Sequence, residues 1–166
     1  MIEPLIKTVE VPCDQATAFK VFVEEMHTWW PLGKFTISAM SGGAAKTIRV
    51  EPKIGGQIVE IGPDDEEYLW GVIKSYDPHD FFAMDFHIPT PDESITPDQP
   101  LEVCTLVEVS FKALGDGKTH VELKQSNFEG LGPRGEDIRG GYTHGLEMIV
   151  CQAYKAACDM KGNCTG

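Results

Sequence analysis

An ordered series of short aromatic, glycine and proline motifs is the feature that most constrains how this chain can fold. The series runs Trp29-Trp30-Pro31, Glu51-Pro52, Gly55-Gly56, Trp70-Gly71-Val72 and Asp77-Pro78. Glycines inside or beside strands mark bends and close backbone approaches, so these motifs predict a curved antiparallel sheet with aromatic residues on or beside it. A curved sheet needs an element to close over, and we expect that element to be a long C-terminal helix.

Most of the chain has residue patterns typical of β-strands. We predict strands at residues 3–11, 46–51, 57–61, 67–76, 81–88, 101–112 and 119–128. Side chains alternate between the two faces of a strand. The inward-facing residues of the last three strands should therefore be Phe82, Met84, Phe86, Val103, Thr105, Val107, Val109, Phe111, Val121, Leu123 and Gln125. The proline-rich residues 89–100 are expected to form a loop between two strands.

Two regions have the apolar period of helices. Residues 15–27 follow Asp14, a residue type that caps helix N-termini well, and residues 136–160 carry a broad apolar stripe. The stripe consists of Ile138, Tyr142, Leu146, Ile149, Ala153, Ala157 and Met160. The order is one strand, one helical region, six strands and a final helix. It lacks βαβ alternation and predicts one α+β domain over residues 1–166 with an antiparallel sheet.

The composition limits the classes of partner. The chain has 166 residues, of which 42% are hydrophobic, enough for one packed core. Its net charge of -12 argues against binding to nucleic acid or an anionic membrane, because both need clustered Lys and Arg. No apolar stretch reaches the roughly 20 residues of a membrane span, and the first residues lack a signal-peptide pattern. We therefore expect a cytoplasmic protein. We interpret the acidic residues 64–67 as a solvated hairpin tip rather than a cation site.

The sequence predicts no metal site and no cofactor. The chain has five cysteines, no Cys-x-x-Cys pair and no secretion signal, so we expect reduced thiols. The helix should separate His144 from Cys151, and Cys151 from Cys158, by about 10 Å along its axis. That distance is too long for them to share one metal ion, and we expect all three at the surface. The glycines between residues 130 and 141 do not have P-loop spacing, and we interpret this segment as a hinge or lid.

In this order of elements, the motifs resemble the START/SRPBCC superfamily, and more narrowly its AHSA-type branch, named for an activator of a heat-shock chaperone ATPase. Bacterial members of that branch often carry Trp-Trp-Pro, Glu-Pro, Gly-Gly, Trp-Gly-x-Val and Asp-Pro in this order. The closing strands also look like the family's, with Val-Glu-Val-x-Phe at residues 107–111 and Thr-x-Val-Glu-Leu at residues 119–123. The resemblance covers nearly the whole chain. It implies the helix-grip fold, in which an antiparallel sheet wraps around one long C-terminal helix.

Several positions differ from the pattern usual in that family. They are His79 and Asp80 after the Asp-Pro turn, Phe86 where Trp is common, Gln125 where His is common, and Tyr142 where Trp is usual. The differences fall on or near the expected pocket. The resemblance therefore implies a fold and a cavity but does not carry over a ligand.

The cavity implied by the resemblance would be lined mainly by aromatic residues. The candidates are Trp29, Trp30, Phe35, Trp70, Phe82, Phe86 and Tyr142. The alternative for these residues is that they fill the core, as aromatic residues usually do. Alternation also points Glu60 and Gln125 inward, where they would be a candidate acid or base and a polar ligand contact. For both, a purely structural hydrogen bond is the simpler interpretation.

Three functions are compatible with these patterns. The first is binding of a hydrophobic or amphipathic small molecule between sheet and helix, without chemistry. The second is an enzyme of the cyclase, hydrolase or lyase type that uses a pocket carboxylate, because the superfamily includes such enzymes. The third is a chaperone-associated interaction module. The ligand, any reaction and the oligomeric state, monomer or homodimer, stay open.

Overall fold

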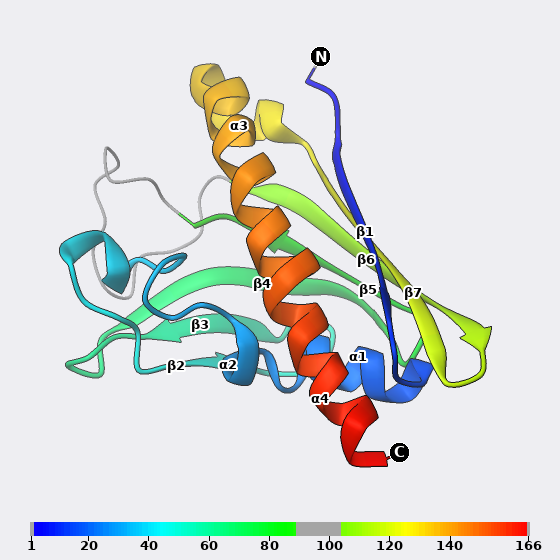
Figure 1. Ribbon diagram of the computed structural model, residues 1–166. Helices are drawn as coiled ribbons and strands as arrows, with labels where there is room; N and C mark the ends of the chain where they lie inside the picture. The colour runs from blue at the N-terminus through cyan, green and yellow to red at the C-terminus, as the bar shows by residue number, and fades with distance from the viewer. Residues whose placement is uncertain (1, 89–103, 166) are drawn as a thin grey trace.

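One seven-stranded antiparallel sheet and one long C-terminal helix make up most of the computed structural model, which describes residues 2–88 and 104–165 (Figure 1). The strands lie in the spatial order β1-β7-β6-β5-β4-β3-β2. They are β1 (Leu5–Val11), β2 (Thr47–Val50), β3 (Gln57–Ile61), β4 (Glu67–Asp77), β5 (Phe81–Phe86), β6 (Thr105–Gly115) and β7 (Lys118–Ser126). The predicted antiparallel sheet is confirmed, whereas the loop expected at residues 89–100 lies outside the described residues.

The helical elements lie on one side of the sheet, and the last of them crosses it diagonally (Figure 1). They are α1 (Gln15–Val23), α2 (Met26–Trp29), η1 (Ser38–Ser41), η2 (Phe128–Arg134), α3 (Gly135–Leu146), η3 (Glu147–Tyr154) and α4 (Lys155–Thr165). The final three run on as one long helix. In the part of the chain that the structure describes, no helix is long and apolar enough to cross a membrane.

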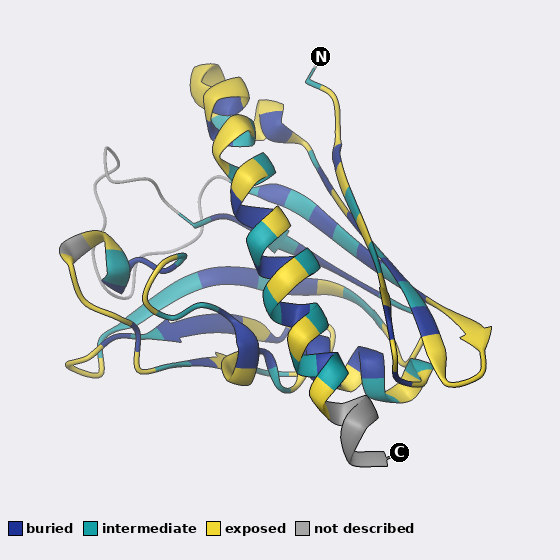
Figure 2. Cartoon of the chain, viewed as in Figure 1, coloured by how far each residue is buried: buried dark blue, intermediate teal, exposed yellow. Residues whose placement is uncertain are grey.

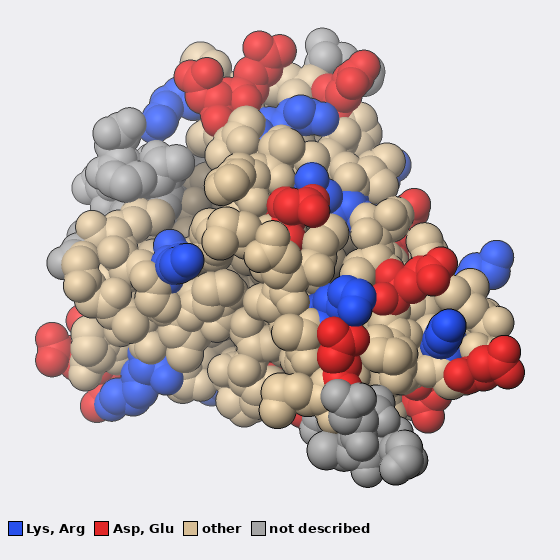
Figure 3. Space-filling model, viewed as in Figure 1, with Lys and Arg blue, Asp and Glu red and all other residues tan. Residues whose placement is uncertain are grey.

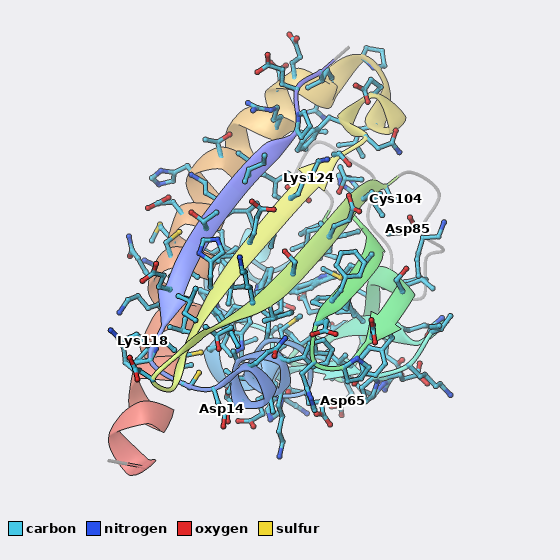
Figure 4. All side chains as sticks on the ribbon, turned by 90° about the vertical axis from the view of Figure 1, so that its right-hand side faces the viewer. Asp14, Asp65, Asp85, Cys104, Lys118 and Lys124 are labelled. Carbon is cyan, nitrogen blue, oxygen red and sulfur yellow. The ribbon has the colours of Figure 1, made fainter. Side chains whose placement is uncertain are left out.

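The strand alternation predicted from the sequence is confirmed for the described residues. The inward positions are buried at Phe82, Met84, Phe86, Thr105, Val107, Val109, Phe111, Val121, Leu123 and Gln125, while Val103 lies outside the described residues. The outer face of the sheet is left uncovered by the helices, and Lys124 and Asp85 project from it (Figure 4). The sheet thus has one apolar face, and that face is turned to the long helix.

Helix α1 starts and packs as its sequence predicts. The Asp14 side chain accepts a hydrogen bond from the Thr17 backbone N–H at 2.7 Å, and this bond holds the pKa of Asp14 below its ordinary value. The helix then places Phe19 and Phe22 against Phe111, with ring centroids 5.1 and 5.9 Å apart. Packing of these rings fixes α1 across one end of the sheet.

The apolar stripe of the final helix differs from the prediction in its second half. Ile138, Leu146 and Ile149 are buried, but Met160 is 70% exposed. The buried positions after Ile149 are Val150, Tyr154 and Cys158. The reason is that η3 is a π-helix, whose wider turns insert extra residues and shift the buried face by one position. Figure 2 shows the outer side of this helix as mostly exposed or half-buried.

The shifted face overturns the expectation that Cys158 lies at the surface. Its thiol is fully buried beside Cys13, and both cysteines are free thiols. The hydrogen bond between the two thiols, together with burial, raises the pKa of Cys158, and the same hydrogen bond lowers the pKa of Cys13. The pair therefore belongs to the packing between α4 and the end of β1.

The glycine motifs occur where two backbone segments come closest. A Cβ at Gly56 would lie 2.0 Å from the Glu51 carbonyl oxygen, and one at Gly71 would lie 2.5 Å from the Asp85 carbonyl oxygen on the neighbouring strand. A β-bulge interrupts the register between β3 and β4 at Ile58 and Val59. Bulges and glycines bend strands, and here they curve the sheet toward the helix.

Replacing Gly56 by alanine should lower the free energy of unfolding by at least about 2 kcal/mol, because the new Cβ overlaps the Glu51 carbonyl. Gly140→Ala is the matched control. Gly140 is an exposed position of α3 where a Cβ meets nothing within 4 Å, so alanine should raise the free energy by up to about 1 kcal/mol. Urea unfolding followed by tryptophan fluorescence measures both. Equal stability of the two variants would contradict this explanation of the motif.

Candidate functional site

A pocket of about 250 Å³ opens between the inner face of the sheet and the first half of the long helix. The sheet side contributes residues from the end of β5, the helix side contributes α3 and the start of η3, and the segment that follows α2 forms the third wall. The lining residues are Trp30, Lys34, Phe35, Thr36, Met40, Phe86, Ile88, Arg134, Asp137, Ile138, Gly141, Tyr142, Gly145, Leu146 and Ile149. Most of these side chains are apolar, so the pocket presents a mainly hydrophobic surface.

The nine residues proposed from the sequence divide into two groups. Four of them line the pocket: Trp30, Phe35, Phe86 and Tyr142. The other five are buried outside its walls: Trp29, Glu60, Trp70, Phe82 and Gln125. The structure thus brings together a wall of four aromatic residues, and a ligand contact by these four stays a prediction.

The four aromatic residues of the wall are held in place by ring packing and hydrogen bonds. The ring centroids of Tyr142 and Phe86 lie 6.0 Å apart, and those of Phe86 and Trp30 lie 6.4 Å apart. Trp30 donates its Nε1–H to the Phe35 carbonyl at 2.8 Å, and the Tyr142 hydroxyl accepts from the Ile88 backbone N–H at 2.9 Å. Because these polar tips have protein partners, the rings offer the pocket their apolar faces.

A second aromatic layer lies behind the wall. Trp70 packs on Trp30 with centroids 4.9 Å apart. Trp29 packs on Tyr154 at 5.2 Å and donates its Nε1–H to the Val21 carbonyl at 2.7 Å. For Trp29, Trp70 and Phe82, the structure therefore supports the alternative interpretation, that these rings fill the core.

Glu60 is a fully buried carboxylate whose oxygens are occupied by four protein donors. Oε1 accepts from the Ile37 backbone N–H at 2.7 Å and from Trp70 Nε1 at 3.0 Å. Oε2 accepts from the Ser38 backbone N–H at 2.7 Å and from the Ser38 hydroxyl at 2.5 Å. Four donors at this distance are the partners a buried charge requires. The arrangement corresponds to the structural hydrogen bonding considered above, with Glu60 tying residues 37–38 to strand β3.

Gln125 supports the pocket from behind its wall. Its Nε2 donates to the Thr105 hydroxyl at 2.9 Å, and that hydroxyl donates to the Phe86 carbonyl at 2.7 Å. Its Oε1 is buried and has no hydrogen-bond partner among the described residues. The chain of bonds connects β7 to the strand that carries the pocket residue Phe86.

Several pocket residues were not identified as candidates from the sequence. Ile138, Leu146 and Ile149 belong to the apolar stripe, whose period cannot separate pocket from core. Lys34, Thr36 and Met40 lie in a segment without a periodic pattern, which is why sequence analysis missed them. The glycine-rich segment at residues 130–141 forms η2 and the start of α3, and it adds Arg134 and Asp137 to the walls. Its role as a hinge or lid stays a prediction.

The acidic run at residues 64–67 contains two ion pairs. Asp65 pairs with Lys46, and Glu67 pairs with Arg49 at 2.7 Å. Both pairs are exposed, as expected of a hairpin tip. Within residues 2–88 and 104–160, no three His, Cys, Asp or Glu side chains are grouped so that they could hold a metal ion. On the face shown in Figure 3, acidic and basic residues are interspersed.

Comparisons with known proteins identify the fold through solved structures. No family model and no curated protein matches the chain. The solution structure of CalC, a self-sacrificing resistance protein from Micromonospora echinospora, is 27% identical over 96% of both chains, with a TM-score of 0.69. The anthrahydroquino-γ-pyrone synthase Txn09 is 28% identical over 83% of this chain and 85% of its own, with a TM-score of 0.57.

A third neighbour, PFC0360w, is described as an HSP90 activator from Plasmodium falciparum. It is 17% identical over 89% of this chain and 95% of its own, with a TM-score of 0.51. At that identity the likeness shows the fold alone.

Replacing Glu60 by glutamine should lower the free energy of unfolding by about 2 kcal/mol or more, because the new NH₂ group would face donors in place of an acceptor. Ser38→Ala, which removes only the hydroxyl donor, should cost about 1 kcal/mol. Urea unfolding of the two variants and the unmodified protein gives both values. A Glu60→Gln protein as stable as the unmodified one would contradict the four-donor arrangement.

Proposed function

Because the chain has the helix-grip fold of the START/SRPBCC superfamily, AHSA type, we propose that it is a small cytoplasmic protein that binds a hydrophobic or amphipathic small molecule without chemistry. The observation that carries this proposal is the apolar pocket between sheet and helix. Its walls come from the sheet, the long helix and the segment after α2. A ligand there would be enclosed by rigid elements, as in most small-molecule sites.

The size and chemistry of the pocket favour a flat aromatic molecule. A volume of about 250 Å³ lies just below the range of about 300–1,000 Å³ that is usual for small-molecule pockets. Trp30, Phe35, Phe86 and Tyr142 offer ring surfaces against which another ring can stack or pack edge to face. The similarity to Txn09 supports the same class, because an anthrahydroquino-γ-pyrone is itself a fused ring system.

An enzymatic function has weaker support. The carboxylate considered for acid or base chemistry belongs to Glu60, which does not line the pocket and already accepts four hydrogen bonds. The similarity to a synthase is the observation in its favour, and such chemistry would need other groups of the pocket. A chaperone-associated role has the least support, because the HSP90 activator PFC0360w is only 17% identical to this chain and its similarity shows the fold alone.

The proposal predicts that N-phenyl-1-naphthylamine, a neutral aromatic probe that fluoresces in apolar surroundings, binds with a Kd on the order of micromolar. Gly145→Leu should weaken this binding at least about tenfold, because its side chain would enter the pocket next to Phe35. A Cβ at Gly145 already meets the Phe35 ring at 3.4 Å. Fluorescence titration measures the affinities.

The matched control is Gly140→Leu, the same change at an exposed glycine of the same helix, where a Cβ meets nothing within 4 Å. It should bind the probe like the unmodified protein. Circular dichroism of both variants shows whether each keeps its secondary structure, so that weaker binding caused by a filled pocket is distinguished from unfolding. Absent probe binding, or equal binding by a folded Gly145→Leu protein, would refute the proposed function.

A further inference from the structure

We propose that the ligand of this pocket carries an acidic group, and that Lys34 and Arg134 bind this group at the pocket mouth. This inference rests on the proposed function and specifies its ligand class. The class is an aromatic acid: a flat ring system with a carboxylate, sulfonate or ionised phenol at one end.

The described residues of the pocket walls include more basic than acidic side chains, whereas the chain as a whole is acidic. The chain has 14 Lys and Arg against 26 Asp and Glu. Among the residues that the structure describes, the ionisable side chains of the walls, apart from the Tyr142 phenol, are two cations, Lys34 and Arg134, and one acid, Asp137. A net positive charge on the described walls of an apolar pocket, in a protein of charge -12, favours an anionic ligand at short range. The repulsion from distant acids is screened beyond about 8 Å at physiological salt.

The position of the two cations fits an amphipathic ligand. Lys34 comes from the segment after α2, and Arg134 comes from the end of η2, so they approach the pocket from different elements. Both residues are exposed, whereas Trp30, Phe86 and Leu146 on the same walls are buried. A ring system in the interior would therefore leave its polar end near these cations.

The polar groups of the inner walls are already used by the protein. The Thr36 hydroxyl donates to the Leu32 carbonyl at 2.8 Å and accepts from the Ala39 backbone N–H at 3.1 Å. The Trp30 Nε1–H donates to Phe35 at 2.8 Å. The Lys34 side chain, in contrast, forms no hydrogen bond or ion pair with any described residue. Recognition of a charged ligand group consequently falls to the pocket mouth, where the Lys34 ammonium can form a charge-assisted hydrogen bond with it.

The charge of Asp137 should affect binding of an acidic ligand in the direction opposite to that of Lys34 and Arg134. Asp137 lies on the same wall as Arg134, in the first turn of α3. Its carboxylate would repel an acidic ligand group, so its neutralisation should strengthen binding of an anion. A pocket that merely attracts apolar molecules would respond to none of these three charges.

The test compares two probes with the same rings, one neutral and one acidic. They are N-phenyl-1-naphthylamine and 8-anilinonaphthalene-1-sulfonate, which differ by the sulfonate. The unmodified protein should bind the sulfonate at least about fivefold more tightly at physiological salt, and the difference should shrink at about 1 M salt, where the Debye length falls to about 3 Å. Lys34→Gln and Arg134→Gln should each weaken sulfonate binding about three- to tenfold, and should weaken binding of the neutral probe much less. Asp137→Asn should strengthen sulfonate binding.

Lys118→Gln is the control for charge alone. Lys118 is an exposed cation at the β6–β7 turn, at the opposite end of the sheet from Cys104 (Figure 4), and it does not line the pocket. This variant should bind both probes like the unmodified protein. Gly145→Leu should lose both probes, which places the sulfonate in the same pocket.

The possible outcomes separate the two proposals. If the neutral probe does not bind, the proposed function fails, and this inference fails with it. If the neutral probe binds but the sulfonate binds no more tightly, only the inference is wrong. The same conclusion follows if Lys34→Gln and Arg134→Gln behave like Lys118→Gln.

Discussion

The buried carboxylate of Glu60 is the interaction on which the architecture of the site depends. A charge in an apolar interior is unfavourable unless donors surround it. Here the four donors come from strand β4 and from the segment formed by Ile37 and Ser38 at the start of η1. Among the described residues, the backbone of Ile37 and Ser38 forms no backbone–backbone hydrogen bond with a strand. Its attachment to β3 through Glu60 fixes the third wall of the pocket, and with it Phe35, Thr36 and Met40.

Aromatic packing extends this fixed wall into the core. Tyr142, Phe86, Trp30 and Trp70 form a continuous series of ring contacts from the long helix through the sheet. Trp70 also donates to Glu60 at 3.0 Å, so the rings and the carboxylate form one unit. If the pocket binds a ligand as proposed, walls held together in this way lower the entropic cost of binding.

The fold was predictable from the sequence to a greater extent than the site. Strand alternation has a period of two that the sequence shows directly, and it placed residues such as Val109 and Leu123 correctly. The helical stripe failed after Ile149, because a π-helical turn leaves no mark in an apolar pattern. Trp29 and Trp30 are adjacent and chemically identical, yet only Trp30 lines the pocket. That difference arises from tertiary packing, which a single sequence does not encode locally.

The π-helical segment also separates the long helix into an upstream part that lines the pocket and a downstream part that is packed in the core. Upstream residues such as Tyr142 and Leu146 face the hollow, whereas downstream Tyr154 is sealed in the interior and donates to the Ala18 carbonyl at 2.8 Å. The downstream half therefore serves as an anchor against α1. Substitutions at the pocket-lining positions of the upstream half would reshape the cavity, while the downstream anchor keeps the helix in place. Under the proposed function, ligand preference could in this way change without any change to the rest of the fold.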